Sequence, residues 1–270
     1  MDKFIVLSKN LNDPYLGRFA NGLPNATVID QNDFNYDKHD GIIVFRGLTK
    51  RKLIENCKKD NREFWYVDTG YFGNYRSLSN PMGHKNWHRV VINDVQNFNI
   101  INKPKDRWDI HKIKLQNRKQ GDDILLVTPS EKPCKFYGIN LDEWVDNTCR
   151  EIKKQTDRTI RIRQKARRQD RVFANTIFDD LDNNIHCVVT YNSIAATEAV
   201  IHGIPAFVQA PNAASKVSNT KLKDIENPFF PDENLRLSWV SSLAYSQFHI
   251  NEMESGKAYK LIRESNEIIN

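Results

Sequence analysis

Apolar and polar positions alternate along this chain in blocks that predict strands and helices in turn. Short continuous apolar runs, each long enough for a buried strand, occupy residues 3–8, 41–47, 63–68 and 122–130, with a weaker run at 26–30. A lysine-rich stretch at 49–60 has helical spacing, and Thr49 stands where a helix cap belongs. Strands separated by helices in this way predict parallel sheets with crossover helices.

Polar, lysine-rich sequence interrupts this pattern between Asn97 and Asp123, and a second series of elements follows. The series predicts an amphipathic helix, a strand, a short polar helix and a tail of two helices, at 140–156, 158–165, 176–184 and 234–269. We therefore expect an α/β protein with two domains and closing C-terminal helices, at 1–105, 106–235 and 236–270.

Composition excludes several classes of protein. The 270 residues are 39% hydrophobic and 27% charged, as in a globular protein. The apolar runs fall far short of the roughly 20 residues of a membrane span, and the charged opening followed by a strand does not suggest a signal peptide. The four cysteines are scattered without a CxxC pair, which disfavours a disulfide framework or zinc site and predicts a cytoplasmic protein without membrane contact.

The net charge of +6 is unevenly distributed along the chain. Residues 1–105 hold 16 Lys and Arg against 11 Asp and Glu, whereas residues 106–270 hold 24 against 23. This asymmetry indicates a first half that faces an anionic partner. The alternative is an ordinary solvated basic surface.

The most regular stretch runs from Ile185 to Val208 and contains a strand, a polar corner, a small-residue helix and a second strand. Asn192 and Ser193 are good helix caps, and Gly203 can end the helix. The first turn of such a helix can bind an anion. Glu198 lies about 7 Å further along the axis, roughly the distance from a nucleotide's phosphates to its ribose. Its alternative role is that of a solvated helix residue.

A row of cations precedes this corner. Arg161, Arg163 and Lys165 alternate with apolar residues and so share one face of the strand at 158–165. Such a row requires an anion to offset its self-repulsion, and a nucleotide diphosphate would serve. If the strand is instead a solvated edge, Ile160 and Ile162 alone must anchor it.

The sequences IRIRQK and VVTYNSIAATEAVIHGIPAFV together resemble the donor half of GT-B glycosyltransferases, especially capsule-polysaccharide-type enzymes. The resemblance covers residues 123–215, and it departs from the family pattern at Lys165, where those enzymes have a histidine. The whole chain also resembles small phage-encoded glycosyltransferases, some of which modify DNA bases.

The resemblance implies two Rossmann-like domains that face each other across a cleft. It implies a UDP-sugar donor on the C-terminal domain, an acceptor on the N-terminal domain, and chemistry without a metal or cofactor. The donor-binding residues are then Arg161, Arg163, Lys165, Asn192, Ser193 and Glu198. The DxD pair Asp180 and Asp182 stands in polar sequence, and a helix surface is the better interpretation than a metal site.

Asp68 is the candidate catalytic base, because it ends a predicted strand immediately before a glycine-rich turn. A turn-capping role is the alternative, and His84 and His88 are rival bases whose HxxxH spacing lacks a third metal ligand. Aromatic and basic residues mix in this region, as suits a sugar or an extruded base. The candidate acceptor-binding residues are Arg46, Tyr71, Arg76, His88 and Arg89, with simple packing as the alternative for the aromatic ones.

The sequence thus predicts a hexosyl- or pentosyltransferase that moves a sugar from a UDP-sugar to a hydroxymethylated pyrimidine. Hydroxymethylcytosine in duplex phage DNA is the expected acceptor, and the host cytoplasm the expected location. A cell-surface or capsular glycan precursor as acceptor, a sugar-nucleotide epimerase and a catalytically idle nucleic-acid-binding module are the alternatives. The sugar, the stereochemistry and the oligomeric state are left open.

Overall fold

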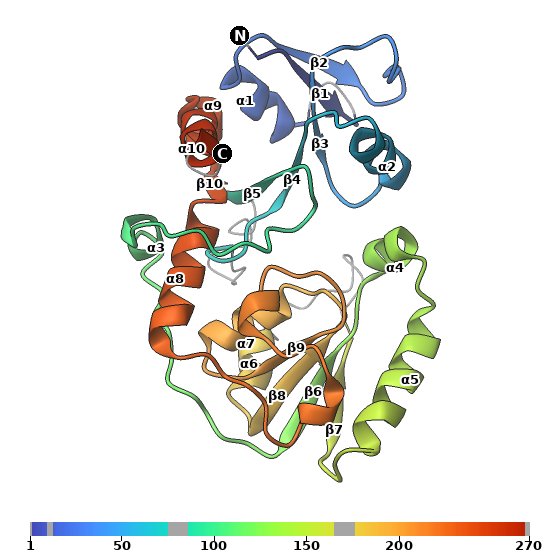
Figure 1. The fold of residues 1–270 in the computed structure, drawn as a ribbon, viewed down its shortest axis with the longest axis vertical. Coiled ribbons are helices and arrows are strands. Elements are labelled where there is room, and N and C mark those ends of the chain that lie inside the picture. Colours follow the sequence, from blue (N-terminus) through green and yellow to red (C-terminus); the bar gives the residue numbers. More distant parts are fainter. Residues whose placement is uncertain (1, 10–12, 75–85, 165–175, 268–270) are drawn as a thin grey trace. The chain divides into compact units, whose positions relative to one another are not determined.

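The computed structural model describes residues 2–9, 13–74, 86–164 and 176–267, and the chain forms two compact units (Figure 1). Unit 1 comprises Met1–Tyr75, Met82–Asn97 and Ala244–Asn270, and unit 2 comprises Arg76–Pro81 and Phe98–Leu243. The expected α/β class is confirmed, with parallel strands in both units. The division differs from the expected 1–105, 106–235 and 236–270, because the end of the chain returns to unit 1.

Unit 1 is built on a six-stranded sheet with the order β10-β5-β4-β3-β1-β2. The strands are β1 (Phe4–Ser8), β2 (Ala26–Asp30), β3 (Ile42–Arg46), β4 (Phe64–Thr69), β5 (Trp87–Ile92) and β10 (Gln247–His249). The first four pair in parallel, β5 pairs antiparallel with β4, and β10 pairs antiparallel with β5. Strands β1, β3 and β4 are buried over most of their length, which explains why they are continuous apolar runs in the sequence.

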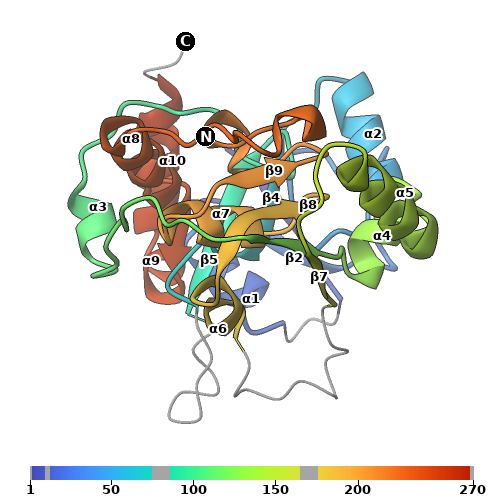
Figure 2. The same cartoon turned by 90° about the horizontal axis from the view of Figure 1, so that it is seen from below.

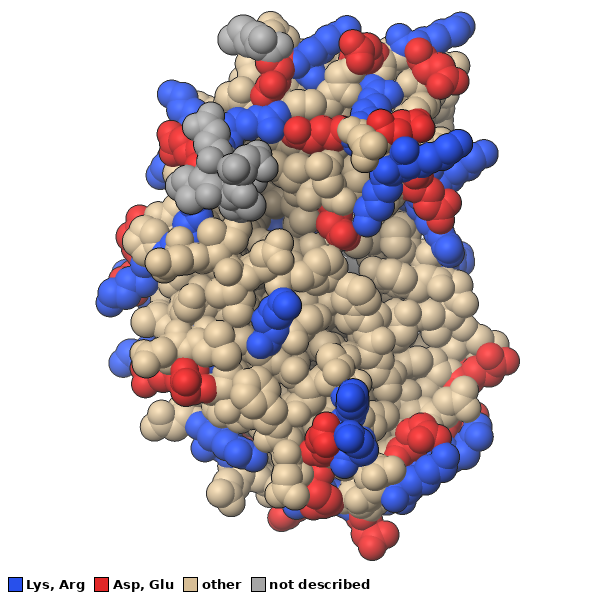
Figure 3. All heavy atoms as spheres, viewed as in Figure 1, with Lys and Arg blue, Asp and Glu red and all other residues tan. Residues whose placement is uncertain are grey.

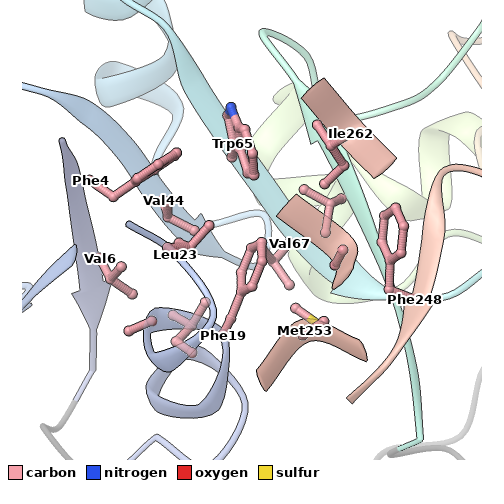
Figure 4. Packing of buried hydrophobic residues seen from close by; sticks show 14 of the residues in the cluster. Phe4, Val6, Phe19, Leu23, Val44, Trp65, Val67, Phe248, Met253 and Ile262 are labelled. Atoms are coloured by element: carbon pink, nitrogen blue, oxygen red, sulfur yellow. The ribbon is translucent and has the colours of Figure 1, made fainter. Parts of the chain in front are cut away.

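Segments from both ends of the chain share the core of unit 1. Its helices are α1 (Leu16–Asn21), α2 (Arg51–Lys59), α9 (Ile250–Glu254) and α10 (Lys257–Glu267). Figure 4 shows Phe248 of β10, Met253 of α9 and Ile262 of α10 in the same cluster as Phe4 and Trp65. The prediction of a tail with two helices is wrong. The C-terminal segment contains three helices and a strand, in the order α8 (Glu233–Ala244), β10, α9 and α10.

Unit 2 contains a four-stranded, fully parallel sheet with the order β7-β6-β8-β9. The strands are β6 (Asp123–Val127), β7 (Ile160–Arg163), β8 (Ile185–Thr190) and β9 (Ala206–Val208). The helices are α3 (Asp106–Asp109), α4 (Glu131–Tyr137), α5 (Leu141–Lys153), α6 (Ile177–Leu181), α7 (Ala195–Ile201) and α8, with 3-10 turns at Ser215–Val217 and Leu222–Asp224. Helices α4 and α5 lie on one side of the sheet, and α6 and α7 on the other (Figures 1 and 2).

Local sequence signals explain how several of these elements begin and end. The side chain of Asn140 caps α5 by accepting the N–H groups of Asp142 and Glu143. Gly203 follows α7 with a φ of +87°, and a Cβ there would stand 2.1 Å from the Asn117 carbonyl oxygen, so only glycine fits. Thr49 does not cap α2, which begins at Arg51 without a side-chain cap.

None of the helices in the described part of the chain has the length and apolar character needed to span a membrane.

Candidate functional site

Asp68, the candidate base, lies near the carboxyl end of β4 within a network of hydrogen bonds. Its Oδ2 accepts a 2.5 Å hydrogen bond from the Tyr66 hydroxyl and lies 3.6 Å from a guanidinium nitrogen of Arg89. Its Oδ1 accepts a 2.8 Å hydrogen bond from the Thr69 N–H, the contact expected of an aspartate that caps a turn. The side chain remains 30% exposed, so the carboxylate is both anchored and accessible.

The surroundings of Asp68 favour its charged form. Burial by itself raises the pKa of Asp68, but the charge of Arg89 and the hydrogen bonds from Tyr66 and Thr69 outweigh it. The charge of Arg46 acts in the same direction, and the pKa lies below the usual value for aspartate. The carboxylate is therefore ionised at neutral pH and able to accept a proton, although a lowered pKa makes it a weak base.

Three of the predicted acceptor-binding residues lie inside unit 1. The exposed fraction is 0% for His88, 1% for Tyr71 and 8% for Arg89. The Arg89 guanidinium lies opposite Asp68 in the β4–β5 pairing and 5.4 Å from the centre of the Tyr71 ring. The burial of Tyr71 corresponds to the packing alternative, and His88 likewise lies in the interior, so the acceptor roles of both stay predictions. Arg89 serves as the counterion of Asp68.

Arg46 occupies a different position, half-buried at the carboxyl end of β3. Its guanidinium lies 4.2 Å from the centre of the Tyr15 ring, and that ring lies 4.7 Å from the His88 ring. Tyr15 was missed by the sequence analysis, because only the fold brings it beside β3 and β5. The remaining acceptor candidate, Arg76, and the rival base His84 lie outside the described residues.

A buried glutamine from the C-terminal segment holds the loop that follows Asp68. Gln247 of β10 is 0% exposed, and its Oε1 accepts the N–H groups of Tyr71 and Phe72 at 2.7 and 3.3 Å. Its Nε2 donates to the Phe72 carbonyl at 3.2 Å. A Cβ on Gly70 would approach Gln247 Oε1 to 2.8 Å, which explains the glycine. No sequence signal linked residue 247 to this loop.

In unit 2 the chain leaves β8 at Thr190 and enters α7 at Ala195, as the sequence predicts. The Thr190 hydroxyl donates to the Val127 carbonyl at 2.9 Å and so ties the carboxyl ends of β8 and β6 together. Ser193 Oγ accepts the Ala195 N–H at 3.3 Å, and Asn212 donates to the Ser193 carbonyl at 2.9 Å. Asn192 is 6% exposed, so Ser193 is the more accessible of the two predicted capping residues.

Glu198 is the partly exposed position of an otherwise buried helix. Within α7, all of which is described, every other residue is buried. The helix has 7 residues and begins at Ala195 rather than at the expected residue 194. Glu198 therefore lies one turn from the corner with its side chain toward the surface. This position is compatible with a ribose contact and with a solvated helix residue.

Arg161 and Arg163 are not free cations. Arg161 lies 3.3 Å from Asp180 and 3.6 Å from Asp123, and Arg163 forms an ion pair with the other oxygen of Asp180. Asp180 on α6 supplies charge that compensates both arginines, so these two do not need a ligand for that purpose, and their role as donor contacts stays a prediction. Strand β7 is an edge strand, as the alternative had it, but Ile162 is 49% exposed, and of the two isoleucines Ile160 packs against the core. Lys165 lies outside the described residues.

The DxD pair lies on α6 and at its end, as predicted. Asp180 binds the two arginines, and Asp182 Oδ1 lies 2.7 Å from His202 Nε2 and 2.8 Å from Lys119 Nζ. Among the described residues, no three His, Cys, Asp or Glu side chains are grouped as a metal site would need. The two carboxylates of the pair are thus engaged by cations of the protein.

An aromatic cluster of Tyr137, Trp144 and Tyr191 lies beside the corner after β8, and the sequence analysis did not identify it. The Tyr191 ring makes T-shaped contacts with Tyr137 and Trp144, at centroid distances of 5.6 and 6.2 Å. Gln209, which follows β9 directly, accepts the Trp144 indole N–H at 2.7 Å and the Thr148 hydroxyl at 3.4 Å. Tyr191 and Gln209 are adjacent because β8 and β9 end side by side.

The structural division changes where the excess positive charge lies. Unit 1 holds 16 Lys and Arg against 15 Asp and Glu, a net of +1, and unit 2 holds 24 against 19, a net of +5. Most of the difference arises because Arg76, Lys103 and Lys105 belong to unit 2, and the C-terminal segment of unit 1 contributes a further −1. In the view of Figure 3, basic and acidic side chains are interspersed over unit 1. The premise of a strongly basic first half therefore does not apply to the folded unit.

No protein-family model matches this sequence, and no curated protein matches it significantly. The fold does match solved structures. One is Thermosulfurimonas dismutans KpsC, beta Kdo 2,7 transferase, with a TM-score of 0.53 and 12% identity over 96% of this chain and 99% of that chain. Another is Thermosulfurimonas dismutans KpsC, beta Kdo 2,4 transferase, with a TM-score of 0.55 and 12% identity over 96% of this chain and 98% of that chain.

These two structures support the capsule-polysaccharide part of the sequence resemblance, and they do not show a similarity to phage-encoded DNA glycosyltransferases. At this level of identity the similarity concerns the fold, and it extends over nearly the whole length of both chains. The protein is a mixed α/β chain with parallel strands in both sheets, and its fold is similar to that of these two Kdo transferases.

Proposed function

We propose that this protein is a GT-B glycosyltransferase that transfers a sugar from a nucleotide-activated donor to a glycan acceptor. The observation that carries the proposal is the fold similarity to two Kdo transferases over 96% of the chain. Because the similarity includes both sheets, it favours the glycan alternative over DNA. Unit 1 has a net charge of only +1, so it lacks the excess of positive charge that was expected to bind DNA.

Donor binding is assigned to unit 2, at the carboxyl ends of β6, β8 and β9. Ligands of open α/β sheets bind at this edge, beyond the ends of the strands. Ser193 and Glu198 are the donor contacts we propose at the described part of this edge, for phosphate and ribose respectively. The neighbours named as Kdo transferases also make an acidic sugar of the Kdo kind a reasonable donor sugar to test.

Acceptor activation is assigned to unit 1, at the carboxyl ends of β3 and β4. In an inverting transfer, the acceptor hydroxyl oxygen bonds to the anomeric carbon while the bond from that carbon to the donor phosphate breaks. The hydroxyl proton would pass to Asp68, which Arg89, Tyr66 and Thr69 hold in its ionised form. The nucleotide leaves with the electron pair. Arg46 is the acceptor contact we propose, because it is only half-buried at the end of the strand next to Asp68 and its charge acts on that carboxylate.

The test incubates the full-length protein with sugars activated as UDP, CMP or GDP derivatives. Lipid-linked glycan, hydroxymethylated duplex DNA, plain DNA and buffer alone serve as acceptors. We expect labelled sugar on the glycan only. Transfer to hydroxymethylated DNA alone would show that the acceptor is DNA, and an altered donor sugar in buffer alone would indicate an epimerase. Failure of every nucleotide to bind would refute the glycosyltransferase proposal.

Substitutions at the donor corner give an independent test. Glu198→Ala should weaken nucleotide binding by about tenfold, since a carboxylate can accept hydrogen bonds from two ribose hydroxyls. Ser193→Ala should weaken it only about threefold. Glu143→Ala, on the exposed side of α5, is the control. Calorimetry with unchanged affinity for Glu198→Ala would remove this residue from the site.

A further inference from the structure

Gln209 presents a hydrogen-bond donor in a fixed orientation at the carboxyl edge of the unit 2 sheet. An indole N–H can only donate, so the 2.7 Å contact with Trp144 requires that Gln209 turns its Oε1 toward the indole. The Thr148 hydroxyl donates to the same oxygen. The Nε2 group must then face away from Trp144, and no described residue accepts a hydrogen bond from it.

The backbone fixes Gln209 as firmly as the side-chain contacts do. Its N–H donates to the carbonyls of Thr190 and Tyr191, at 3.1 Å each, and the next N–H, of Ala210, donates to Tyr191 at 2.9 Å. These bonds join the ends of β8 and β9. The free amide donor is therefore placed by the sheet itself and costs little conformational entropy when a ligand accepts it.

Tyr191 offers an aromatic surface beside this donor. Its ring is half-buried and held by T-shaped contacts, at an interplanar angle of 63° to Tyr137 and 89° to Trp144. Contacts on two sides fix the plane of the ring. Tyr191 also stands two residues before Ser193, so their Cα atoms are at most about 7 Å apart, and one nucleotide can contact both residues.

We propose that Tyr191 and Gln209 form the subsite for the base of the donor nucleotide. Tyr191 supplies a stacking surface, and Gln209 Nε2 donates to a carbonyl oxygen of the base. Uracil, cytosine and guanine carry such an exocyclic carbonyl, whereas adenine offers only ring nitrogens as acceptors. A donor placed for an exocyclic oxygen does not reach these nitrogens with the same geometry, so the subsite favours the three carbonyl-bearing bases over adenine. This inference rests on the proposed donor site in unit 2 and adds the residues that choose the base.

The experiment measures binding of UMP, CMP, GMP and AMP to the full-length protein by calorimetry, without any transfer reaction. We expect AMP to bind at least about fivefold more weakly than the best of the other three, the loss from one hydrogen bond. Equal affinity for AMP would overturn the role of Gln209. The comparison uses the unaltered chain, so it does not depend on any variant folding.

Three variants test the contributions of Tyr191 and Gln209 separately. Tyr191→Leu keeps the apolar contact but removes the stacking surface, and it should weaken binding at least about fivefold, whereas Tyr191→Phe should restore it. Gln209→Glu keeps an acceptor for Trp144 and Thr148 but replaces the donor, so it should abolish the preference against AMP. Phe229→Leu, at a 49% exposed aromatic of the same unit, is the matched control.

The outcomes separate the two proposals. If no nucleotide binds the unaltered protein, both the donor site and its base subsite fail. If nucleotides bind but Tyr191→Leu and Gln209→Glu leave affinity and base preference unchanged, the donor site stands and the base subsite is wrong.

Discussion

Unit 1 and unit 2 begin from the same local pattern but complete their sheets differently. Each contains four parallel strands, β1–β4 in unit 1 and β6–β9 in unit 2. Unit 2 stops there. Unit 1 adds the antiparallel strands β5 and β10, and β10 arrives from the far end of the chain. Alternating sequence is thus enough to predict the parallel part of each sheet, whereas completion of unit 1 depends on distant pairing.

The two units also use their charged residues differently. In unit 1 the Asp68–Arg89 pair lies between adjacent strands, with side chains 30% and 10% exposed. In unit 2 Asp180 neutralises two arginines on an edge strand. Arg46 in unit 1, which is half-buried, and Gln209 Nε2 in unit 2 are not engaged by a carboxylate among the described residues. Ligand contacts are better sought at these two side chains than at the paired charges.

Truncation after Leu243 should have the largest effect, because it should unfold unit 1 and leave unit 2 folded. It removes five buried apolar side chains from the unit 1 core, Phe248, Ile250, Met253, Ala258 and Ile262. Loss of a single large core side chain costs about 2–5 kcal/mol, and whole domains are stable by only about 5–15 kcal/mol. Hydrogen exchange should show free exchange in β1–β4 and retained protection in β6–β9. Protection of β1–β4 in the truncated chain would contradict the shared core.

Asp68→Asn should abolish transfer without changing the binding of nucleotides to unit 2. The amide keeps the shape of the side chain but cannot accept the proton, and removal of a general base costs about 10²–10⁴-fold in rate. Nucleotide affinity should stay unchanged. Asp94→Asn, at a surface ion pair of the same unit, is the control. Near-normal turnover of Asp68→Asn would rule out this residue as the base.

Asp180→Asn should affect stability rather than donor binding. Arg161 and Arg163 would then face each other without their shared carboxylate, which we expect to cost about 1–3 kcal/mol of unfolding free energy. Asp146→Asn, on the exposed face of α5, should change stability by less than about 0.5 kcal/mol. A large change in nucleotide affinity for Asp180→Asn would instead show that the two arginines contact the donor.

The acid stability of unit 1 should depend on Asp68. Its pKa is lower in the folded chain than in the unfolded one, so its ionised form stabilises the fold. This contribution is complete above about pH 4, the ordinary value for aspartate, and is lost as the pH falls through the folded value. Asp68→Asn should therefore flatten the dependence of unfolding free energy on pH below about 4. An unchanged slope would mean that Arg89 does not lower this pKa.

Excess EDTA should leave transfer unchanged, the smallest effect of the series. Asp180 and Asp182, the carboxylates of the DxD pair, already bind Arg161, Arg163, His202 and Lys119. Activity measured before and after chelation tests this, with added manganese as the control. Loss of activity that manganese restores would show a metal requirement.

Part of the candidate site could be predicted from sequence because it depends on strand ends. Arg46 and Asp68 end neighbouring parallel strands, so their proximity follows from the predicted sheet. The corner from Thr190 to Ala195 follows from the buried strand before it and the small residues after it, although α7 is capped at Ile194 rather than at the predicted Asn192 or Ser193. The net charge of unit 1 could not be predicted from sequence, because the folded units do not follow chain order. Arg76, Lys103 and Lys105 belong to unit 2, whereas residues 244–270 belong to unit 1.

The amino-acid sequence by itself determined the α/β class, most strands of both sheets and the position of Asp68, Ser193 and Glu198 in them. These features depend on periodicity and capping, which act over a few neighbouring residues. Only the tertiary structure decided that Gln247 holds the loop after Asp68, that Asp180 neutralises the arginine row, and that Gln209 lies beside Tyr191. Each of these contacts joins segments far apart in the chain, and their pairing is selected by packing of the whole unit rather than by local pattern.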